Sequence, residues 1–240
     1  MSVECPKCDY EGEHIGMHWT RSKDCSHPPL TTKQRDVIQA LVMGDGSVEL
    51  SNANARLSVV MSSKEYLEYL DKVVFGLLST GVRISKTAEE SASCARKSGF
   101  RPNAESENYK DLHVLRTRRH PDICDFITDN GRSNMAWPLW YDISPTVMKH
   151  WYASDGWYRT DNGHRYMAIS TNTDVVGKDR LVSMFADSKA PNPNRVDVTP
   201  TDYNTTKLKL IWSVDGSEEM FEYMGNSLPG FEYKWPNGGE

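Results

Sequence analysis

The sequence predicts an α+β protein with two halves built on one plan, preceded by a short cysteine-rich module. Both halves show apolar spacings in the order helix, two strands, helix, two strands, helix. A helix that ends in Asp-Gly occurs in each half, at Asp45 and at Asp155, 110 residues apart. Such internal duplication places similar surfaces across an approximate two-fold axis within one chain. We therefore expect a monomer that resembles a dimer, divided into residues 1–29, 30–130 and 131–240.

The composition is that of a globular protein. Of the 240 residues, 38% are hydrophobic and 10% are aromatic, which excludes a chain that is disordered throughout. No apolar run reaches the roughly 18 residues of a membrane span, so we expect no membrane insertion. Residues 1–10 contain no apolar signal segment. We therefore expect a cytoplasmic protein, associated with the nucleoid if the source is prokaryotic.

The charge is acidic on average and uneven along the chain. A formal net charge of -5 by itself disfavours a nucleic-acid-binding protein, because such domains are usually basic. Residues 96–119, however, hold seven basic and three acidic side chains, whereas residues 213–224 hold four acidic and no basic ones. We therefore expect a basic face on an acidic body.

The first thirty residues have the pattern of a small metal site. Cys5 and Cys8 are separated by two residues, a spacing that directs two thiolates to one ion, and zinc takes four nitrogen or sulfur ligands. A segment this short cannot bury a core of its own, so a structural ion is expected. The predicted ligands of one structural Zn²⁺ are Cys5, Cys8, His18 and Cys25. His27 is a rival fourth ligand and His14 a weaker one, and the pair at 28–29, both proline, is expected to be a stiff linker.

The first half begins with a helix capped by Thr31 or Thr32 and ending at Gly46, which suits the position after a helix. The elements expected after it are a strand at 55–61, a helix at 62–77, a short strand at 82–86, a polar loop at 87–110, a strand at 112–118 and a short helix at 120–127. The isolated cysteines Cys94 and Cys124 are expected to be inert.

The second half repeats this order. Ser144 is the expected N-cap of a helix with Pro145 at its first position, and this helix ends at Asp155 and Gly156. The elements expected after it are a strand at 165–170, a helix from about 173, a short strand at 194–198, a strand at 206–212, a helix at about 216–224 and an irregular tail from 229 to 240.

A carboxylate thus lies at the C-terminal end of one helix in each half. That end is the negative pole of the helix dipole, which is unfavourable for an acid. The position becomes favourable where a cation binds the carboxylate and the free carbonyls of the helix end. Asp-Gly is also common in ordinary turns. Two such pairs at the same place in a repeat, Asp45 and Asp155, indicate a shared cation-binding role.

These two motifs resemble those of the LAGLIDADG homing endonucleases in their single-chain, two-motif form. The first motif spans 38–46 and contains Gly44-Asp45-Gly46, and the second spans 148–156 and contains Ser154-Asp155-Gly156. The resemblance covers about residues 30 to 235. It implies two αββαββα units whose motif helices pack side by side and whose curved sheets form a saddle that enters the major groove of double-stranded DNA.

The resemblance also implies a phosphodiesterase centre with Mg²⁺, or Mn²⁺, as cofactor. Asp45 and Asp155 would hold the metal near the approximate two-fold axis, each facing one scissile phosphate, and the carbonyls of Gly44 and Ser154 would complete the coordination. Lys207 or Lys209 would polarise the water or the phosphate, with Arg116 or Arg118 in the matching place of the first half.

Basic residues that alternate with apolar ones on the strands predict a sheet with one basic face, able to reach phosphates and guanine edges. The predicted DNA-binding residues are Arg56, Arg116, Arg118, Arg165 and Lys209. The function expected is site-specific cleavage of double-stranded DNA. The alternative is a cleavage-inactive nucleic-acid-binding protein on the same fold, either an RNA maturase or a transcriptional regulator.

Overall fold

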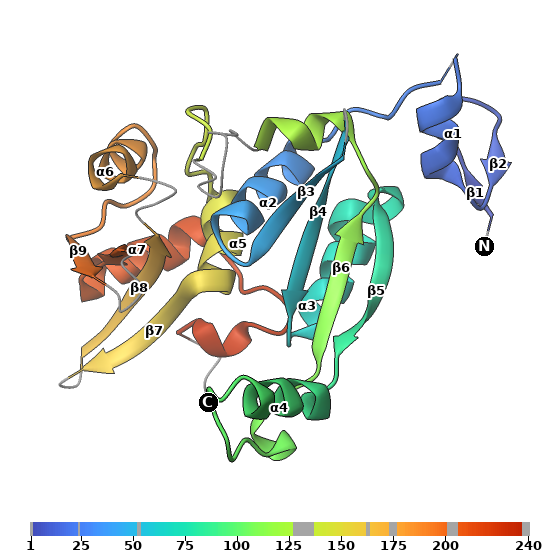
Figure 1. Cartoon of the computed structure of the whole chain (residues 1–240). Helices are drawn as coiled ribbons and strands as arrows, with labels where there is room; N and C mark the ends of the chain where they lie inside the picture. Colours follow the sequence, from blue (N-terminus) through green and yellow to red (C-terminus); the bar gives the residue numbers. More distant parts are fainter. Residues whose placement is uncertain are drawn as a thin grey trace.

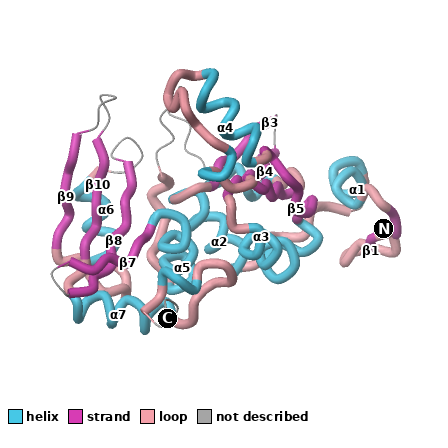
Figure 2. Tube along the Cα trace, turned by 90° about the horizontal axis from the view of Figure 1, so that it is seen from below, coloured by secondary structure: helices cyan, strands magenta, loops and turns pink. Residues whose placement is uncertain are grey.

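Two four-stranded antiparallel sheets flank a central pair of helices in a computed structural model of the chain (Figure 1). The structure describes residues 2–23, 25–51, 54–126, 137–161, 164–172, 177–200 and 206–236. The central helices α2 (Thr32–Met43) and α5 (Pro145–Asp155) pack against each other between the sheets, as Figure 2 also shows. No helix among the described residues is both long and apolar enough to cross a bilayer.

The first sheet follows α2 and has the strand order β3-β4-β6-β5. Its strands are β3 (Gly46–Ser51), β4 (Asn54–Met61), β5 (Ser79–Lys86) and β6 (Leu112–Thr117). Helix α3 (Lys64–Tyr69) continues into a π-helical segment, Leu70–Phe75, and the two connect β4 to β5. The helix before the sheet begins at a capping box, in which Thr31 and Gln34 satisfy each other's backbone N–H groups.

The second sheet follows α5 and has the matching order β7-β8-β10-β9. Its strands are β7 (Gly156–Asp161), β8 (His164–Asn172), β9 (Arg195–Pro200) and β10 (Thr206–Ile211). Helices α6 (Lys178–Ala186) and α7 (Val214–Met224) complete this half. The expected α+β plan of two similar units is confirmed, and the expected boundary at 130/131 lies outside the described residues.

Strand register makes the two sheets equivalent position by position. Gly46 pairs with Val59 just after α2, and Gly156 pairs with Ile169 just after α5. The inner strands continue the match, since Val59 pairs with Leu115 and Ile169 pairs with Leu210. Residues of the two halves can therefore be compared by structure where their sequences differ.

Several expected elements were wrong or displaced. The expected polar loop at 87–110 contains α4 (Ala88–Lys97), which was overlooked because its composition is polar, although Thr87 and Glu90 form a capping box at its start. Strands β3 and β7 begin at the glycines of the two Asp-Gly pairs, where only helix ends were expected. Helix α6 begins at Lys178, and the expected start near residue 173 lies outside the described residues.

A buried hydrogen bond joins helix α3 of the first half to the central helix α5 of the second. The Tyr66 hydroxyl of α3 lies 2.6 Å from Nδ1 of His150 on α5, and both side chains are buried. Burial lowers the pKa of His150 to about 3, so the ring is neutral at physiological pH. A neutral, hydrogen-bonded pair is compatible with the apolar core on both sides.

Candidate active site and nucleic-acid interface

The C-terminal ends of α2 and α5 approach each other closely because the residues there are small. A Cβ atom added at Gly44 would lie 2.6 Å from Cβ of Ser154 and 3.2 Å from Oδ2 of Asp155. Any side chain at position 44 would force the helix ends apart. The structure therefore brings the acid of the second motif against the backbone of the first, as two equivalent helices at close approach require.

Both predicted metal-binding acids are partly buried and electrostatically coupled. Burial, and after it the negative charge of Asp45, raises the pKa of Asp155 to about 7, although Lys234 and Lys207 act in the opposite direction. Burial also raises the pKa of Asp45, against the lowering effect of Lys234. Two carboxylates that repel each other in a poorly hydrated site form a natural receptor for a cation.

Lys234 also belongs to this site, although it was not among the predicted residues. Its Nζ donates to the carbonyl oxygen of Ala153 at 2.6 Å and lies 3.4 Å from that of Ser154. Burial lowers the pKa of Lys234, while Asp45 and Asp155 raise it. A cation at the end of α5 compensates the helix dipole and both acids. The one available signal was a lysine isolated among aromatic residues near the end of the chain.

A cavity of about 310 Å³ opens beside Asp155. It is lined by Val42, Met43, Gly44, Trp137, Asp155, Ser170, Thr171 and Lys207. Gly44 and Asp155 were both predicted as metal-site residues, and they line the same cavity as the predicted basic residue Lys207. The Ser154 carbonyl, also predicted as a ligand, is instead near Lys234.

Removal of the Asp155 charge should stabilise the protein when no Mg²⁺ is present. The folded-state pKa of about 7 lies above the value of about 3.9 in an unfolded chain, so the folded state loses stability as pH rises between these values. At pH 8, Asp155→Asn should raise the free energy of unfolding by about 1–3 kcal/mol, and at pH 4 the gain should nearly vanish. Urea denaturation at both pH values measures this. A variant less stable than wild type at pH 8 would contradict it.

The open face of the second sheet, the face away from its helices, is basic and aromatic. Lys209 of β10 lies over the ring of Trp157 on β7, with Nζ 5.2 Å from the ring centroid. Lys207 lies two residues away on β10, so it has the same orientation. Arg195 and Asp197 of β9 form an ion pair of 3.0 Å. Trp157 was not among the predicted DNA-binding residues.

The open face of the first sheet carries a cluster of two arginines around an acid. Arg56 of β4 donates to Glu49 of β3 through Nε at 2.8 Å, and also through its terminal nitrogen. Nε of Arg116 on β6 lies 3.8 Å from the other oxygen of Glu49. Two predicted DNA-binding arginines are thus held by a carboxylate that was not predicted.

Two other arginines predicted to bind DNA are elsewhere. Arg165 has the strand parity of Met167 and Ile169, whose side chains are buried in the core beneath the sheet, so Arg165 lies on the helix side of its sheet. Arg118 lies beyond β6, donates through Nε to the carbonyl of Leu77, and packs against Gly16 of the N-terminal module. The structure thus places these two arginines away from the open faces of the sheets, and their binding to DNA stays a prediction.

Comparison with solved structures identifies the fold. The homing endonuclease I-WcaI, solved bound to its DNA recognition sequence, matches with a TM-score of 0.63 and 13% identity over 93% of this chain and 92% of the other. The chain has the LAGLIDADG homing endonuclease fold. The N-terminal LAGLIDADG domain of WhiA matches with a TM-score of 0.44 and 11% identity, over 90% of this chain and 92% of the other. No family model and no curated protein sequence matches the chain.

The N-terminal module precedes the homing endonuclease fold and lies at the far end of the first sheet from the second (Figure 1). It contains a hairpin of β1 (Val3–Glu4) and β2 (Glu11–Gly12), followed by α1 (Ile15–Arg21). Its donor atoms all lie within 4.8 Å of one another and come from Cys5, Cys8, His18 and Cys25. These are the four predicted zinc ligands.

The geometry of this cluster fits a tetrahedral ion. The Sγ atoms of Cys5 and Cys25 are 3.5 Å apart, and Sγ of Cys8 is 3.2 Å from Nε2 of His18. A zinc tetrahedron with Zn–S bonds of about 2.3 Å has S–S edges of about 3.8 Å. Burial, together with the two neighbouring cysteines, raises the pKa of Cys25 to about 12. The three sulfurs therefore need a cation before all can be thiolates.

His27, the rival ligand, is not part of the cluster. Its ring packs between Trp19 and His120, with centroid distances of 5.6 and 4.9 Å. His120 in turn binds the linker, since its Nε2 is 2.8 Å from the carbonyl oxygen of Pro28. The two histidines thus fasten the module to the first half.

Proposed function

We propose that this protein is a site-specific double-stranded DNA endonuclease that hydrolyses phosphodiesters with a divalent metal. The observation that carries the proposal is the pair of coupled acids, Asp45 and Asp155, at adjoining helix ends in a LAGLIDADG homing endonuclease fold. One solved structure with this fold, I-WcaI, is a homing endonuclease bound to its DNA recognition sequence. Its DNA partner supports double-stranded DNA as the partner here.

The donor chemistry of the site suits Mg²⁺ or Mn²⁺. Asp45, Asp155 and the carbonyl of Gly44 offer the oxygen ligands that these ions prefer. A bound divalent ion would supply charge neutralisation at the phosphate and a water of lowered pKa. Proton release from Asp155 must precede metal binding at neutral pH, since burial raises its pKa to about 7.

The protein's own groups would position the substrate. Lys207 places a positive charge on the cavity wall beside Asp155, where it can hold a phosphate oxygen. The open faces of both sheets would face the major groove of the DNA. Hydrogen-bond donors would come from Lys209 of the second sheet and from Arg56 and Arg116 of the first, and Trp157 would add an aromatic surface. Their contacts would set the register of the DNA so that a phosphate reaches the acids.

Selection of a target in Ca²⁺, followed by a metal change, tests the proposal. Randomised DNA duplexes and RNA hairpins of equal length are bound to the full chain in Ca²⁺, enriched and sequenced. The proposal expects one recognised duplex sequence, which is cut when Mg²⁺ replaces Ca²⁺. Enrichment of RNA alone, or a specific duplex that stays intact in Mg²⁺ and Mn²⁺, would instead favour a binding protein without cleavage activity.

A further inference from the structure

The two sheets differ at the positions closest to the acids. Their registers equate Val59 with Ile169 and Leu115 with Leu210, because each pair occupies the same place in its ladder. Counting outward along both inner strands gives each cavity-lining residue of β8 and β10 a counterpart in the first half. Lys207 corresponds to Leu112, Ser170 to Val60 and Thr171 to Met61.

The residues of β8 and β10 that line the Asp155 cavity are polar, whereas their counterparts in the first half are apolar. The second half offers an ammonium and two hydroxyls, on Lys207, Ser170 and Thr171. The first half offers only the apolar side chains of Leu112, Val60 and Met61 at the same positions, and Val60 is 41% exposed there. An exposed valine on a groove-facing strand binds no phosphate oxygen, so the two sides present different surfaces to the two DNA strands.

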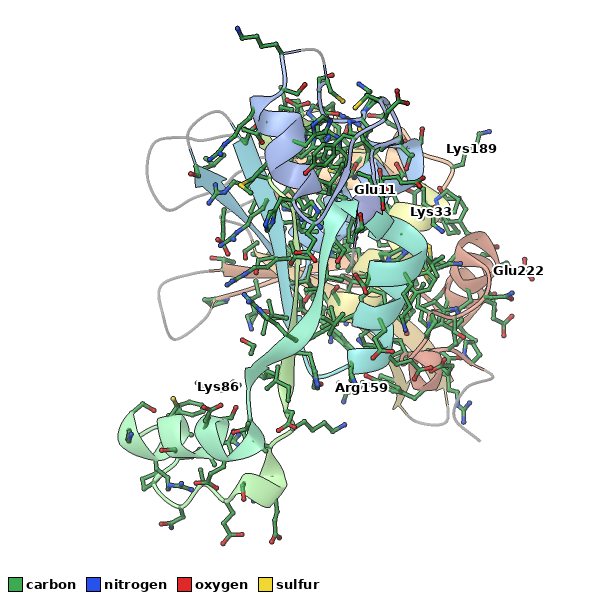
Figure 3. All side chains as sticks on the ribbon, turned by 90° about the vertical axis from the view of Figure 1, so that its right-hand side faces the viewer. Glu11, Lys33, Lys86, Arg159, Lys189 and Glu222 are labelled. Carbon is green, nitrogen blue, oxygen red and sulfur yellow. The ribbon has the colours of Figure 1, made fainter. Side chains whose placement is uncertain are left out.

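Neither Lys86 nor Lys234 takes the place of Lys207 in the first half. Lys86 pairs with Leu112 in register, but it lies on the edge strand β5, one strand further from α2, where the chain leaves the sheet for α4 (Figure 3). Lys234 acts on both acids, and its ammonium is bonded at the end of α5. Neither is the counterpart of Lys207.

We infer that the two cleavage centres differ in rate. The DNA strand that faces Asp155 is cut first, and a nicked duplex accumulates before the second DNA strand is cut. The inference rests on the proposed function. Each cut is a hydrolysis: a water oxygen bonds to phosphorus, one phosphorus–oxygen bond to a sugar breaks, and the departing oxygen takes a proton. Lys207 stabilises the added phosphate charge at one centre only, an effect worth about 10²-fold in rate.

Strand-resolved kinetics test the inference on a Ca²⁺-selected duplex labelled differently on its two strands. We expect one strand to be cut about 10²-fold faster by the full chain in Mg²⁺. Asp155→Asn should abolish the fast cut and Asp45→Asn the slow one. Equal rates on both strands would overturn the inference and leave the proposed function intact. If neither strand is cut, the proposed function fails and the inference fails with it.

Exchange of the two equivalent residues gives a sharper test. Lys207→Leu should slow the fast cut until the rates are similar, and Leu112→Lys should accelerate the slow one. Ser51→Lys, which adds the same charge at the far end of β3, should change neither rate. If Lys86→Ala slows the second cut as much as Lys207→Leu slows the first, then Lys86 supplies the positive charge at the second centre and the inference is wrong.

A readout without cleavage accompanies these rates. In Ca²⁺, the slope of log Kd against log salt concentration counts the phosphates neutralised, at about 0.9 per contact. Leu112→Lys should steepen the slope by about one contact, and Lys207→Leu should reduce it by the same amount. An unchanged slope for both variants would show that neither position meets a phosphate.

Discussion

Asp155→Asn is expected to lower the rate of cutting of its DNA strand by about 10³-fold, with little change in target affinity. An asparagine has nearly the shape of an aspartate but no charge, so it cannot neutralise a divalent ion or help to ionise the water. Asp45→Asn should act in the same way on the other strand. Cleavage is measured on the selected duplex in Mg²⁺, and affinity is measured in Ca²⁺.

The folded state should survive both changes, which makes the result interpretable. The buried carboxylates repel each other, so each asparagine removes an unfavourable charge instead of a stabilising contact. Asp215→Asn is a matched control, because that acid lies in the first turn of α7 and not at the end of a central helix. If both site variants cut at the wild-type rate, Asp45 and Asp155 are not the catalytic acids.

Removal of zinc is expected to unfold the N-terminal module and leave the remaining fold intact. The core of the module consists of Cys5, Ile15, Trp19 and Cys25, which is too small to be stable alone. Metal binding and folding are therefore one event, and loss of a ligand such as Cys8 should lower zinc affinity by about 10²-fold or more. Elemental analysis should find one zinc per chain in wild type and little in Cys8→Ser.

Limited proteolysis separates the two parts of the chain. Cys8→Ser should become sensitive to cleavage within residues 2–25 while the remainder resists as wild type does. Cys94→Ser, a change at an exposed cysteine of α4, should retain zinc and resist throughout. A module that stays protected without metal, or a zinc content above one per chain, would disprove the predicted ligand set.

The acids were predictable because two independent physical signals coincide at them. A carboxylate at the end of a helix is unfavourable without a cation, and the same residue recurs in a repeat with equal element order. Cys5 and Cys8 were predictable for a similar reason, since short spacing alone brings their thiols together. In these cases the chemistry depends on neighbours in sequence, which local rules describe well.

Residues that depend on tertiary placement were not predictable in this way. Lys234 reaches the centre from the end of the chain, and no local pattern connects it to α5. Arg165 was assigned to the wrong face because alternation fixes which residues share a face, not which face the helices cover. Arg118 packs against the N-terminal module, and no local sequence pattern shows where that module docks. Glu49 was missed because cross-strand pairing requires the register.

The claim that Asp45 and Asp155 form a metal-dependent nuclease centre is tested most directly on one supercoiled plasmid that carries the selected target. Wild-type protein should convert it first to a nicked circle and then to a linear molecule when Mg²⁺ is present, and the double variant Asp45→Asn/Asp155→Asn should bind it without cutting. Binding by wild type with the plasmid left intact in both Mg²⁺ and Mn²⁺, or equal cutting by the double variant, would contradict the claim.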